Sequence, residues 1–418
     1  MRSTPLLVLT LSAALGIVDG GFQPDLVRDS AYNLVGEVGP STIAEPGKTA
    51  ATQSFNLSPD GAQLVLLYET WKTQTGSPEN TGLWIALWDR SAQKITKQVH
   101  LAENDLPPPA HNSDPRGPIF NENYLYMLRL RRDLVISANQ SFVLVMALGR
   151  VWVLDARSYS TVCTINSPDS APAAPVQIQD VGKSGFAVVF QDGVKHFRVD
   201  LFDFPSGKLL AEWPSTVIPD SFSPDGMLAV APDLDNRNDD GVTSVQLLDG
   251  RSGKKIKSIP VGFGFKKSRF GAPTANGSVI GKFLNNQEIV VAPSADRDRS
   301  GLRSGNSLEI IDTSQGRVTR EITPQKFGPI GVLVVSADRT HFAVESVEAG
   351  KHWISTESLN PKHYTHKAMV FASKSGAMEA AIPISSARAG GNVSLRISAD
   401  ASTLAMRIGE AAQILSVK

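Results

Sequence analysis

The sequence predicts an all-β chain that forms a seven-bladed β-propeller of four-stranded blades, and three features of its 418 residues carry this expectation. A strand pattern that ends in Asp recurs about every 54 residues. Tight-turn signals such as Ser223-Pro224-Asp225-Gly226 separate short runs of apolar residues. Apolar residues spaced as on a helix are almost absent. Four short strands in each of seven repeats are typical of a propeller.

The N-terminal 20 residues differ from the rest of the chain. Arg2 is followed by a short apolar core, Pro5 to Gly16, and then by small residues. This order is typical of a secretory signal peptide, so we expect a mature domain of residues 21–418 that is secreted or periplasmic. A buried N-terminal strand or a short membrane anchor is the alternative. No later stretch has 18 consecutive apolar residues, so the sequence predicts no transmembrane span after residue 20.

The third strand of each repeat is the clearest element. Its copies are Trp84–Asp89, Val151–Asp155, Val199–Asp203, Val245–Asp249 and Leu308–Asp312, with weaker ones at Ala368–Ala372 and Gln413–Ser416. A strand and turn precede each copy, at Phe55–Gly61, Val135–Asn139, Val176–Asp180, Ser221–Val230, Phe283–Asn286, Val334–Asp338 and Leu395–Asp400. The last repeat stops at its third strand, so we expect Tyr32–Val38 to supply the outer strand and close the ring. Six blades with an irregular N-terminal segment are the alternative.

The Ser-Pro-Asp-Gly turns and the turns such as Asp249-Gly250-Arg251-Ser252-Gly253-Lys254 carry a family resemblance. Over about residues 50–418 the chain resembles the bacterial WD40-like, TolB-like and YVTN-type propeller repeats. The pair Trp88-Asp89 occurs once, and the Gly-His signature of eukaryotic WD40 repeats is absent. The resemblance implies a propeller fold. It is nearly silent on function, because that superfamily spans scaffolds, periplasmic binding components and a few enzymes.

The long connections between strands indicate the working surface. They lie between second and third strands at Tyr68–Leu83, Pro232–Val242, Pro293–Asn306 and Ser346–His366, and between blades at His100–Asp133 and Pro260–Val279. In a propeller these two kinds of connection share one face, which we call the long-loop face. Long loops are uncommon unless they are functional or disordered, so we predict that this face binds the ligand or partner. Tolerated surface insertions are the alternative.

Two groups of side chains in these connections are candidate contacts. Aromatic and histidine side chains suit the centre of a protein interface, and these are Tyr68, Trp71, His352, Trp353, His363, Tyr364 and His366. Arginines suit an anionic ligand, and these are Arg131, Arg132, Arg297, Arg299 and Arg303. Arg131 and Arg132 precede an inner strand, so we expect them at the mouth of the central channel. Ordinary solvated side chains are the alternative for both groups.

Charge and motifs exclude several classes of function. The net charge is zero, which argues against nucleic acid as the main partner. The sequence has no nucleophile elbow and no phosphate-binding loop. The three histidines of one loop match no zinc spacing, and we predict no cofactor and no metal. The oxygen-rich segment Asp233–Gly241 makes calcium conceivable, but its spacing does not fit a calcium loop, and a solvated turn is expected.

The recurrent aspartates and the single cysteine are predicted to be structural. Asp60, Asp225 and the Asp residues that end the third strands are expected to accept backbone N–H bonds in turns. Cys163 is the one cysteine, so no intrachain disulfide exists, and a buried thiol is expected.

The sequence therefore predicts an exported, non-catalytic propeller that binds a protein or cell-envelope ligand through its long-loop face. A lactonase-like or hydrolase-like enzyme with a site at the central channel is one alternative. A structural assembly module is the other.

Overall fold

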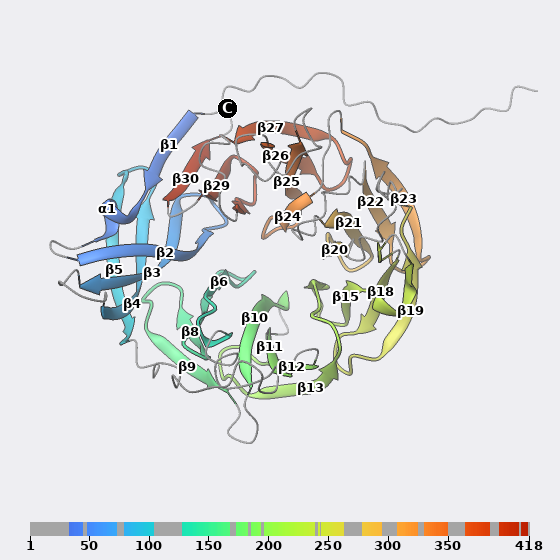
Figure 1. The fold of residues 1–418 in the computed structure, drawn as a ribbon, viewed down its shortest axis with the longest axis horizontal. Coiled ribbons are helices and arrows are strands. Elements are labelled where there is room, and N and C mark those ends of the chain that lie inside the picture. Colours follow the sequence, from blue (N-terminus) through green and yellow to red (C-terminus); the bar gives the residue numbers. More distant parts are fainter. Residues whose placement is uncertain are drawn as a thin grey trace, which may run out of the picture.

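The computed structural model is a ring of seven four-stranded antiparallel sheets around a central channel (Figure 1). It describes residues 33–44, 48–72, 79–103, 128–167, 173–182, 185–193, 196–238, 241–242, 244–262, 278–294, 307–324, 330–349, 364–384, 393–408 and 411–416. The predicted all-β, seven-bladed propeller is confirmed.

Each blade places its strands side by side in chain order, from the inner strand at the channel to the outer strand at the rim. Blades 1 to 3 consist of β2 (Lys48–Leu57), β3 (Gln63–Lys72), β4 (Glu79–Asp89) and β5 (Lys94–Ala102); β6 (Asp133–Ile136), β7 (Phe142–Ala147), β8 (Arg150–Asp155) and β9 (Thr161–Asn166); and β10 (Ala174–Asp180), β11 (Phe186–Gly193), β12 (His196–Phe202) and β13 (Leu209–Ser215).

Blades 4 to 6 follow the same order, with one insertion. They consist of β14 (Ser221–Phe222), β15 (Leu228–Pro232), β18 (Ser244–Asp249) and β19 (Lys255–Pro260); β20 (Ser278–Phe283), β21 (Glu288–Ser294), β22 (Leu308–Asp312) and β23 (Arg317–Ile322); and β24 (Ile330–Val335), β25 (His341–Ala349), β26 (Tyr364–Ala372) and β27 (Met378–Ile384). The insertion in blade 4 is the 3₁₀ turn η2 (Leu234–Asn236) and the hairpin β16 (Arg237–Asn238) and β17 (Gly241–Val242).

Blade 7 combines the two ends of the chain. Its strands are β28 (Ser394–Ile397), β29 (Thr403–Ile408), β30 (Ala411–Ser416) and β1 (Asn33–Val38), and a short helix, α1 (Pro40–Ile43), follows β1. The register pairs Asn33 with Ser416 and Val38 with Ala412. The predicted closure by the N-terminal strand is confirmed, and it covers the edge of β30 that would otherwise be open.

Local turn chemistry explains why the strands begin and end where they do. Ser223 Oγ donates to Asp225 Oδ1 over 2.6 Å and accepts from the Leu228 backbone N–H over 3.0 Å. Gly226 has a φ of 70°, which a residue with a side chain rarely adopts. The same Ser-to-Asp or Ser-to-Asn bond recurs in the turns that begin at Ser58, Ser137, Ser336 and Ser398.

The core lies between neighbouring blades. Alternating residues of each strand point to opposite faces of the sheet, so each blade packs against both neighbours. Phe222, Phe283 and Phe342 are at most 1% exposed. Burying one such side chain stabilises the fold by about 1.5–3 kcal/mol. One apolar cluster joins Leu144 of blade 2 to Phe186 of blade 3, and comparable clusters fill the other gaps of the ring.

The two faces of the ring differ in the length of their connections. Turns such as 58–62, 203–208 and 313–316 lie on one face, which we call the short-turn face. On the long-loop face, the connection between β5 and β6 runs from residue 103 to residue 132. Strand pairing extends further than the sequence indicated, because β3 continues to Lys72 and β25 continues to Ala349. The predicted loops 68–83 and 346–366 are therefore partly strand.

Candidate binding face and central channel

A buried ion pair lies at the long-loop face between blades 1 and 2. Arg132 precedes β6, and its Nε donates to Oε1 of Glu69, on β3, over 2.7 Å. The Arg132 side chain is 4% exposed and the Glu69 side chain 9%. Arg132 Nη1 also donates to the backbone oxygens of Arg129 and Arg131. The guanidinium therefore fixes the segment that leads into β6.

The same polar network continues into blade 7. Gln53 Nε2 donates to Glu69 Oε2 over 3.3 Å. Arg407, on β29, donates through Nη1 to the backbone oxygens of Thr52 and Gln53. Burial lowers the pKa of Arg407, and the Arg396 charge acts in the same direction. Because these residues come from blades 7, 1 and 2, the network ties together the blades around the point where the ring closes.

A second ion pair joins the inner strands of the same three blades. Arg396 Nη2, on β28, lies 3.8 Å from Oδ1 of Asp133, the first residue of β6. The Arg396 guanidinium also lies over the Phe55 ring, 5.6 Å from its centroid. Ser54 Oγ donates to Asp133 Oδ1 over 3.4 Å. Both charged side chains keep about a quarter or more of their surface exposed, at 25% and 30%.

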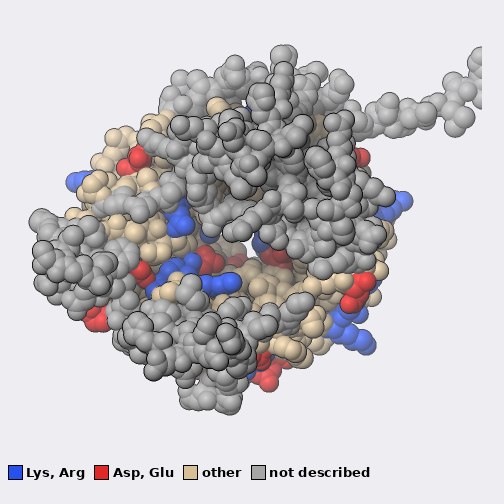
Figure 2. All heavy atoms as spheres, viewed as in Figure 1, with Lys and Arg blue, Asp and Glu red and all other residues tan. Residues whose placement is uncertain are grey.

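Further charges lie on other inner strands. Lys282, on β20, donates through Nζ to the backbone oxygen of Asp220, and the Gly281 N–H donates to Asp220 Oδ2 over 3.0 Å. Burial raises the pKa of Asp220 to about 6, against the opposing charge of Lys282. Burial lowers the pKa of Lys282. Desolvation also raises the pKa of Asp180, at the end of β10, to about 6. Figure 2 shows acidic and basic atoms together around the central opening.

Glu309 is a buried carboxylate in blade 5. It is 3% exposed, its Oε1 accepts the Gly262 N–H over 2.8 Å, and its Oε2 has no hydrogen-bond partner among the residues that the structure describes. Burial raises the pKa of Glu309 to about 7; the Gly262 N–H opposes this rise, and the charge of Glu321, on the neighbouring strand, adds to it. Glu309 is therefore protonated in part near neutral pH.

The structure corrects one predicted aromatic contact and leaves most of the others as predictions. Tyr68 is 2% exposed and stacks on Trp84 with ring centroids 6.4 Å apart, so it is a core residue and not a surface contact. The backbones of Trp71, Tyr364 and His366 lie at the long-loop ends of β3 and β26, but their side chains are outside the described part of the chain. His352, Trp353 and His363 also lie outside the described residues.

The predicted arginines have different placements. Arg131 is exposed, and its Nη1 donates to the backbone oxygen of Val176 over 3.4 Å. Arg132 forms the buried ion pair with Glu69. Arg297, Arg299 and Arg303 lie outside the described residues. Of the predicted arginines that the structure describes, Arg131 is therefore exposed and Arg132 is paired, and the other three stay predictions.

The turn aspartates are confirmed as structural. Oδ1 of Asp249 accepts hydrogen bonds from the Ser252 N–H over 2.8 Å and from the Ser252 hydroxyl over 2.7 Å. These bonds lower the pKa of Asp249. Asp89, Asp155 and Asp312 accept equivalent bonds, and Asp203 accepts the Ser206 hydroxyl.

Asp233 is not the solvated turn residue that the sequence suggested. It is fully buried, and Lys255 Nζ lies 2.9 Å from each of its carboxylate oxygens. Asn236 and Ser258 also donate to it. Its oxygens are therefore occupied by the side chains of the same blade. Within the described ranges, no group of three or more His, Cys, Asp or Glu residues is placed to hold a metal ion.

Cys163 is half-buried in β9, and burial raises the pKa of its thiol. The expectation of a buried thiol is therefore met in part. In the part of the chain that the structure describes, no helix has both the length and the apolar character needed to span a bilayer.

Comparisons with known proteins support the fold alone. No family model and no curated protein matches the sequence. A chain in the crystal structure of the mitotic checkpoint complex is similar, with a TM-score of 0.54 and 11% identity; the match covers 93% of this chain and 97% of that chain. A chain of hydrazine synthase from Kuenenia stuttgartiensis aligns with a TM-score of 0.34 and 16% identity, over 86% of this chain and 74% of that chain. The first match supports the overall fold, and the bacterial WD40-like, TolB-like or YVTN type stays a prediction.

Proposed function

We propose that this chain is an exported, non-catalytic β-propeller, of the bacterial TolB-like or YVTN type, that binds a protein or cell-envelope ligand through its long-loop face. The propeller fold is commonly a protein-binding scaffold, which fits the general form of this proposal. The observation that carries the proposal is the contrast between the two faces. Connections on the short-turn face are turns such as 58–62, whereas the long-loop face carries connections such as 103–132.

The polar network beneath the long-loop face supports this role. Glu69, Arg132 and Arg407 tie blades 7, 1 and 2 together where β3 and the segment before β6 reach that face. Binding residues on loops need a rigid support. A flexible site must be ordered when the ligand binds, and the entropy cost of that ordering lowers the affinity. The network supplies such a support next to the exposed Arg131.

Export rests on residues 1–20, which lie outside the described residues. We expect the full chain to appear in the periplasm or medium of a bacterial host, and a variant that lacks residues 2–20 to stay in the cytoplasm. Cell fractionation with an antibody against the propeller tests this. Equal amounts of both forms in the cytoplasm would remove export from the proposal.

Affinity capture from an envelope extract tests the binding face. The bait is residues 21–418, and the variant bait has residues 350–363 replaced by a short Gly-Ser connection. This replacement leaves the strand ends Ala349 and Tyr364 in place, so the β25–β26 pairing is kept. A second variant, Arg131→Glu, reverses one exposed charge on the long-loop face. Arg157→Glu is the matched control, because Arg157 is exposed in a turn on the short-turn face.

We expect mass spectrometry to identify a partner that the unaltered bait and Arg157→Glu retain, and that at least one long-loop variant loses. A partner lost with Arg157→Glu and retained with both long-loop variants would contradict the proposal. Retention by all baits would favour an assembly module that uses the outer surface of the ring.

A channel enzyme is a second candidate, because Asp220 and Lys282 combine perturbed pKa values with positions beside the channel. This candidate predicts hydrolysis in a panel of lactones and esters that Asp220→Asn abolishes. Activity that Asp220→Asn leaves unchanged would remove the channel as its source.

A further inference from the structure

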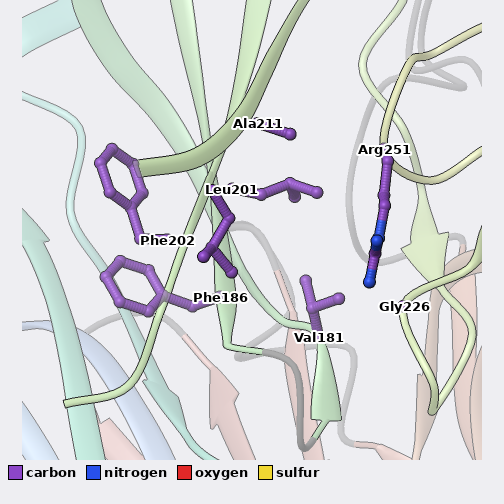
Figure 3. A pocket seen from close by; sticks show the side chains of 8 residues that line it. Val181, Phe186, Leu201, Phe202, Ala211, Gly226 and Arg251 are labelled. Atoms are coloured by element: carbon purple, nitrogen blue, oxygen red, sulfur yellow. The ribbon is translucent and has the colours of Figure 1, made fainter. Parts of the chain in front are cut away.

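A cavity of about 180 Å³ opens on the short-turn face between blades 3 and 4, away from the proposed binding face. Its lining residues are Val181, Phe186, Leu201, Phe202, Leu210, Ala211, Gly226 and Arg251. They come from the ends of β11, β12 and β13, from the turn after β10 and from two turns of blade 4. Figure 3 shows Arg251 on one side of the cavity and Val181 near its middle, whereas the rings of Phe186 and Phe202 on the far side are turned away from Arg251.

Two close contacts hold the blades at a fixed spacing around this cavity. Gly182 packs its backbone against blade 4, where a Cβ would lie 2.1 Å from the Pro224 oxygen. Trp213 Nε1 donates to the Gly250 oxygen over 3.3 Å, and the Trp213 ring fills the space where a Cβ of Gly253 would lie. The atoms of the two blades are already in contact at these points. The blades therefore cannot move closer together and close the cavity.

The body of the cavity is apolar. Val181 is 2% exposed and Leu201 7% exposed, and both belong to the apolar cluster between blades 3 and 4, with Ala211 packed against it. The Phe186 and Phe202 rings pack on the other face of the sheet, against blade 2. Leu210, at the mouth of the cavity, is 54% exposed. An apolar cavity of about 150 Å³ is large enough to hold a benzene ring. This cavity therefore has room for a ring or for a chain of about six carbons.

Arg251 supplies the polar group of the site. Its backbone N–H donates to Asp249 Oδ1 over 3.2 Å, but its guanidinium makes no hydrogen bond or salt bridge with any residue that the structure describes. Asp249 is the nearest carboxylate along the chain; its Oδ1 accepts hydrogen bonds from Ser252, and the Arg251 charge helps to lower the pKa of Asp249 without a hydrogen bond from the guanidinium. A guanidinium with free donors beside an apolar cavity is complementary to a carboxylate.

We propose that this cavity binds a small monocarboxylic acid with a ring-sized apolar body. The apolar body contacts Val181, Leu201 and Ala211, and the carboxylate pairs with Arg251. The apolar contacts supply affinity through the area that they remove from water, and Arg251 selects acids over neutral molecules of the same shape.

The test is a titration of the full mature chain, labelled at Val and Leu methyl groups, with phenylacetate at constant ionic strength. We expect saturable NMR shifts at Val181, Leu201 and Leu210, with a dissociation constant on the order of 1 mM for a ligand of this size. 2-Phenylethanol keeps the ring without the charge, and acetate keeps the charge without the ring, so both are expected to bind at least about tenfold more weakly.

Variants separate this site from general binding. Arg251→Met keeps the aliphatic stem and removes the charge, and it is expected to weaken phenylacetate binding about tenfold. Arg157→Met is the matched control, because Arg157 holds the same place in the Asp-x-Arg-Ser turn of blade 2. Ala211→Leu fills the cavity and is expected to abolish the shifts. The proposal is overturned if no methyl group near the cavity shifts at 20-fold the expected dissociation constant, or if Arg251→Met and Arg157→Met bind alike.

Discussion

Arg132 and Glu69 carry opposite charges at a site where both side chains are less than a tenth exposed. A buried charge is tolerated when a partner and further hydrogen bonds replace its lost hydration. Arg132 has the carboxylate and two backbone oxygens, and Glu69 also accepts from Gln53. Sequence spacing alone does not reveal this pair. The two residues lie 63 positions apart, so they do not show the short spacing of a salt bridge within one helix or strand.

Arg132→Met should destabilise the protein by about 3 kcal/mol, because it leaves the Glu69 carboxylate buried without its cation. The double variant Glu69→Gln with Arg132→Met should recover most of this loss, because no unpaired charge remains. The free energy of unfolding from urea titrations measures both effects. If the double variant is as unstable as the sum of the two single variants, the pair is not coupled as described.

Glu309 makes stability depend on pH. The pKa of an unfolded Glu is about 4.3, whereas burial raises that of Glu309 to about 7. Between these values the folded chain retains a proton that the unfolded chain has lost, so stability falls as pH rises from about 4 to about 7. Asp220 and Asp180, with pKa values raised to about 6, contribute in the same direction.

Glu309→Gln should therefore raise stability at pH 8 by about 1–2 kcal/mol and flatten the decline between pH 4 and pH 7. The Gly262 N–H keeps an acceptor in this variant, because the amide oxygen replaces the carboxylate oxygen. Unfolding midpoints measured at pH 5 and pH 8 provide the comparison. Glu321→Gln, at the paired position on β23, is the matched control and should change the pH dependence far less. An equal effect of both variants would show that burial of Glu309 is not the cause.

At the scale of the element, β1 is the strand on which ring closure depends. It pairs with β30 along the chain from Asn33 to Val38, although the two strands lie at opposite ends of the sequence. Val38 is fully buried in the cluster that also holds Ile414. The pairing replaces an open strand edge and joins the apolar contacts of blades 7 and 1.

A disulfide across this pair should stabilise the oxidised protein. Glu37 and Gln413 face each other in the register, and both lie at the surface of the sheet. The variant Glu37→Cys with Gln413→Cys should gain up to about 4 kcal/mol when oxidised, because the bridge constrains nearly the whole unfolded chain. Thermal unfolding with and without reductant measures the gain. Equal midpoints in both conditions would contradict the register of the closing strand.

The strands also show which parts of the fold could be predicted from the sequence. The turn signals near Ser223 and the aspartates that end the third strands are local, so they predicted the strands and their order. The missing outer strand of the last repeat predicted the role of β1. The extension of β3 to Lys72 depends on pairing with Glu79 to Asp89, which is a contact between strands and has no local signature.

The candidate site was predicted far less well, for a physical reason. Aromatic and basic residues were chosen because their types suit interfaces, but exposure depends on packing. Tyr68 lies on the same face of β3 as Leu64 and Leu66, and all three belong to one apolar cluster of the core. Asp133, Lys282 and Arg396 lie in or at the start of inner strands, where a charge interrupts an apolar run. That interruption was a usable signal for channel residues.

At the scale of the whole molecule, the two faces of the propeller differ, and the proposed function assigns binding to the long-loop face. The blades pack on each other through apolar clusters, the short-turn face carries the tight turns between strands, and the long-loop face carries the longer connections. The Arg132 network and the Arg396–Asp133 pair connect blades 7, 1 and 2. Loops on a rigid scaffold are where binding residues are commonly found.

Lysine labelling of the captured complex tests the central claim most directly. Lys48 and Lys72 pair at the long-loop end of blade 1, whereas Lys94, Lys208 and Lys374 are exposed at the short-turn face. With the partner bound, we expect acetylation of Lys48 or Lys72 to slow at least about fivefold, and the three short-turn lysines to react as in the free protein. Protection of Lys94, Lys208 and Lys374 with unchanged reactivity at Lys48 and Lys72 would place the partner on the opposite face and contradict the account.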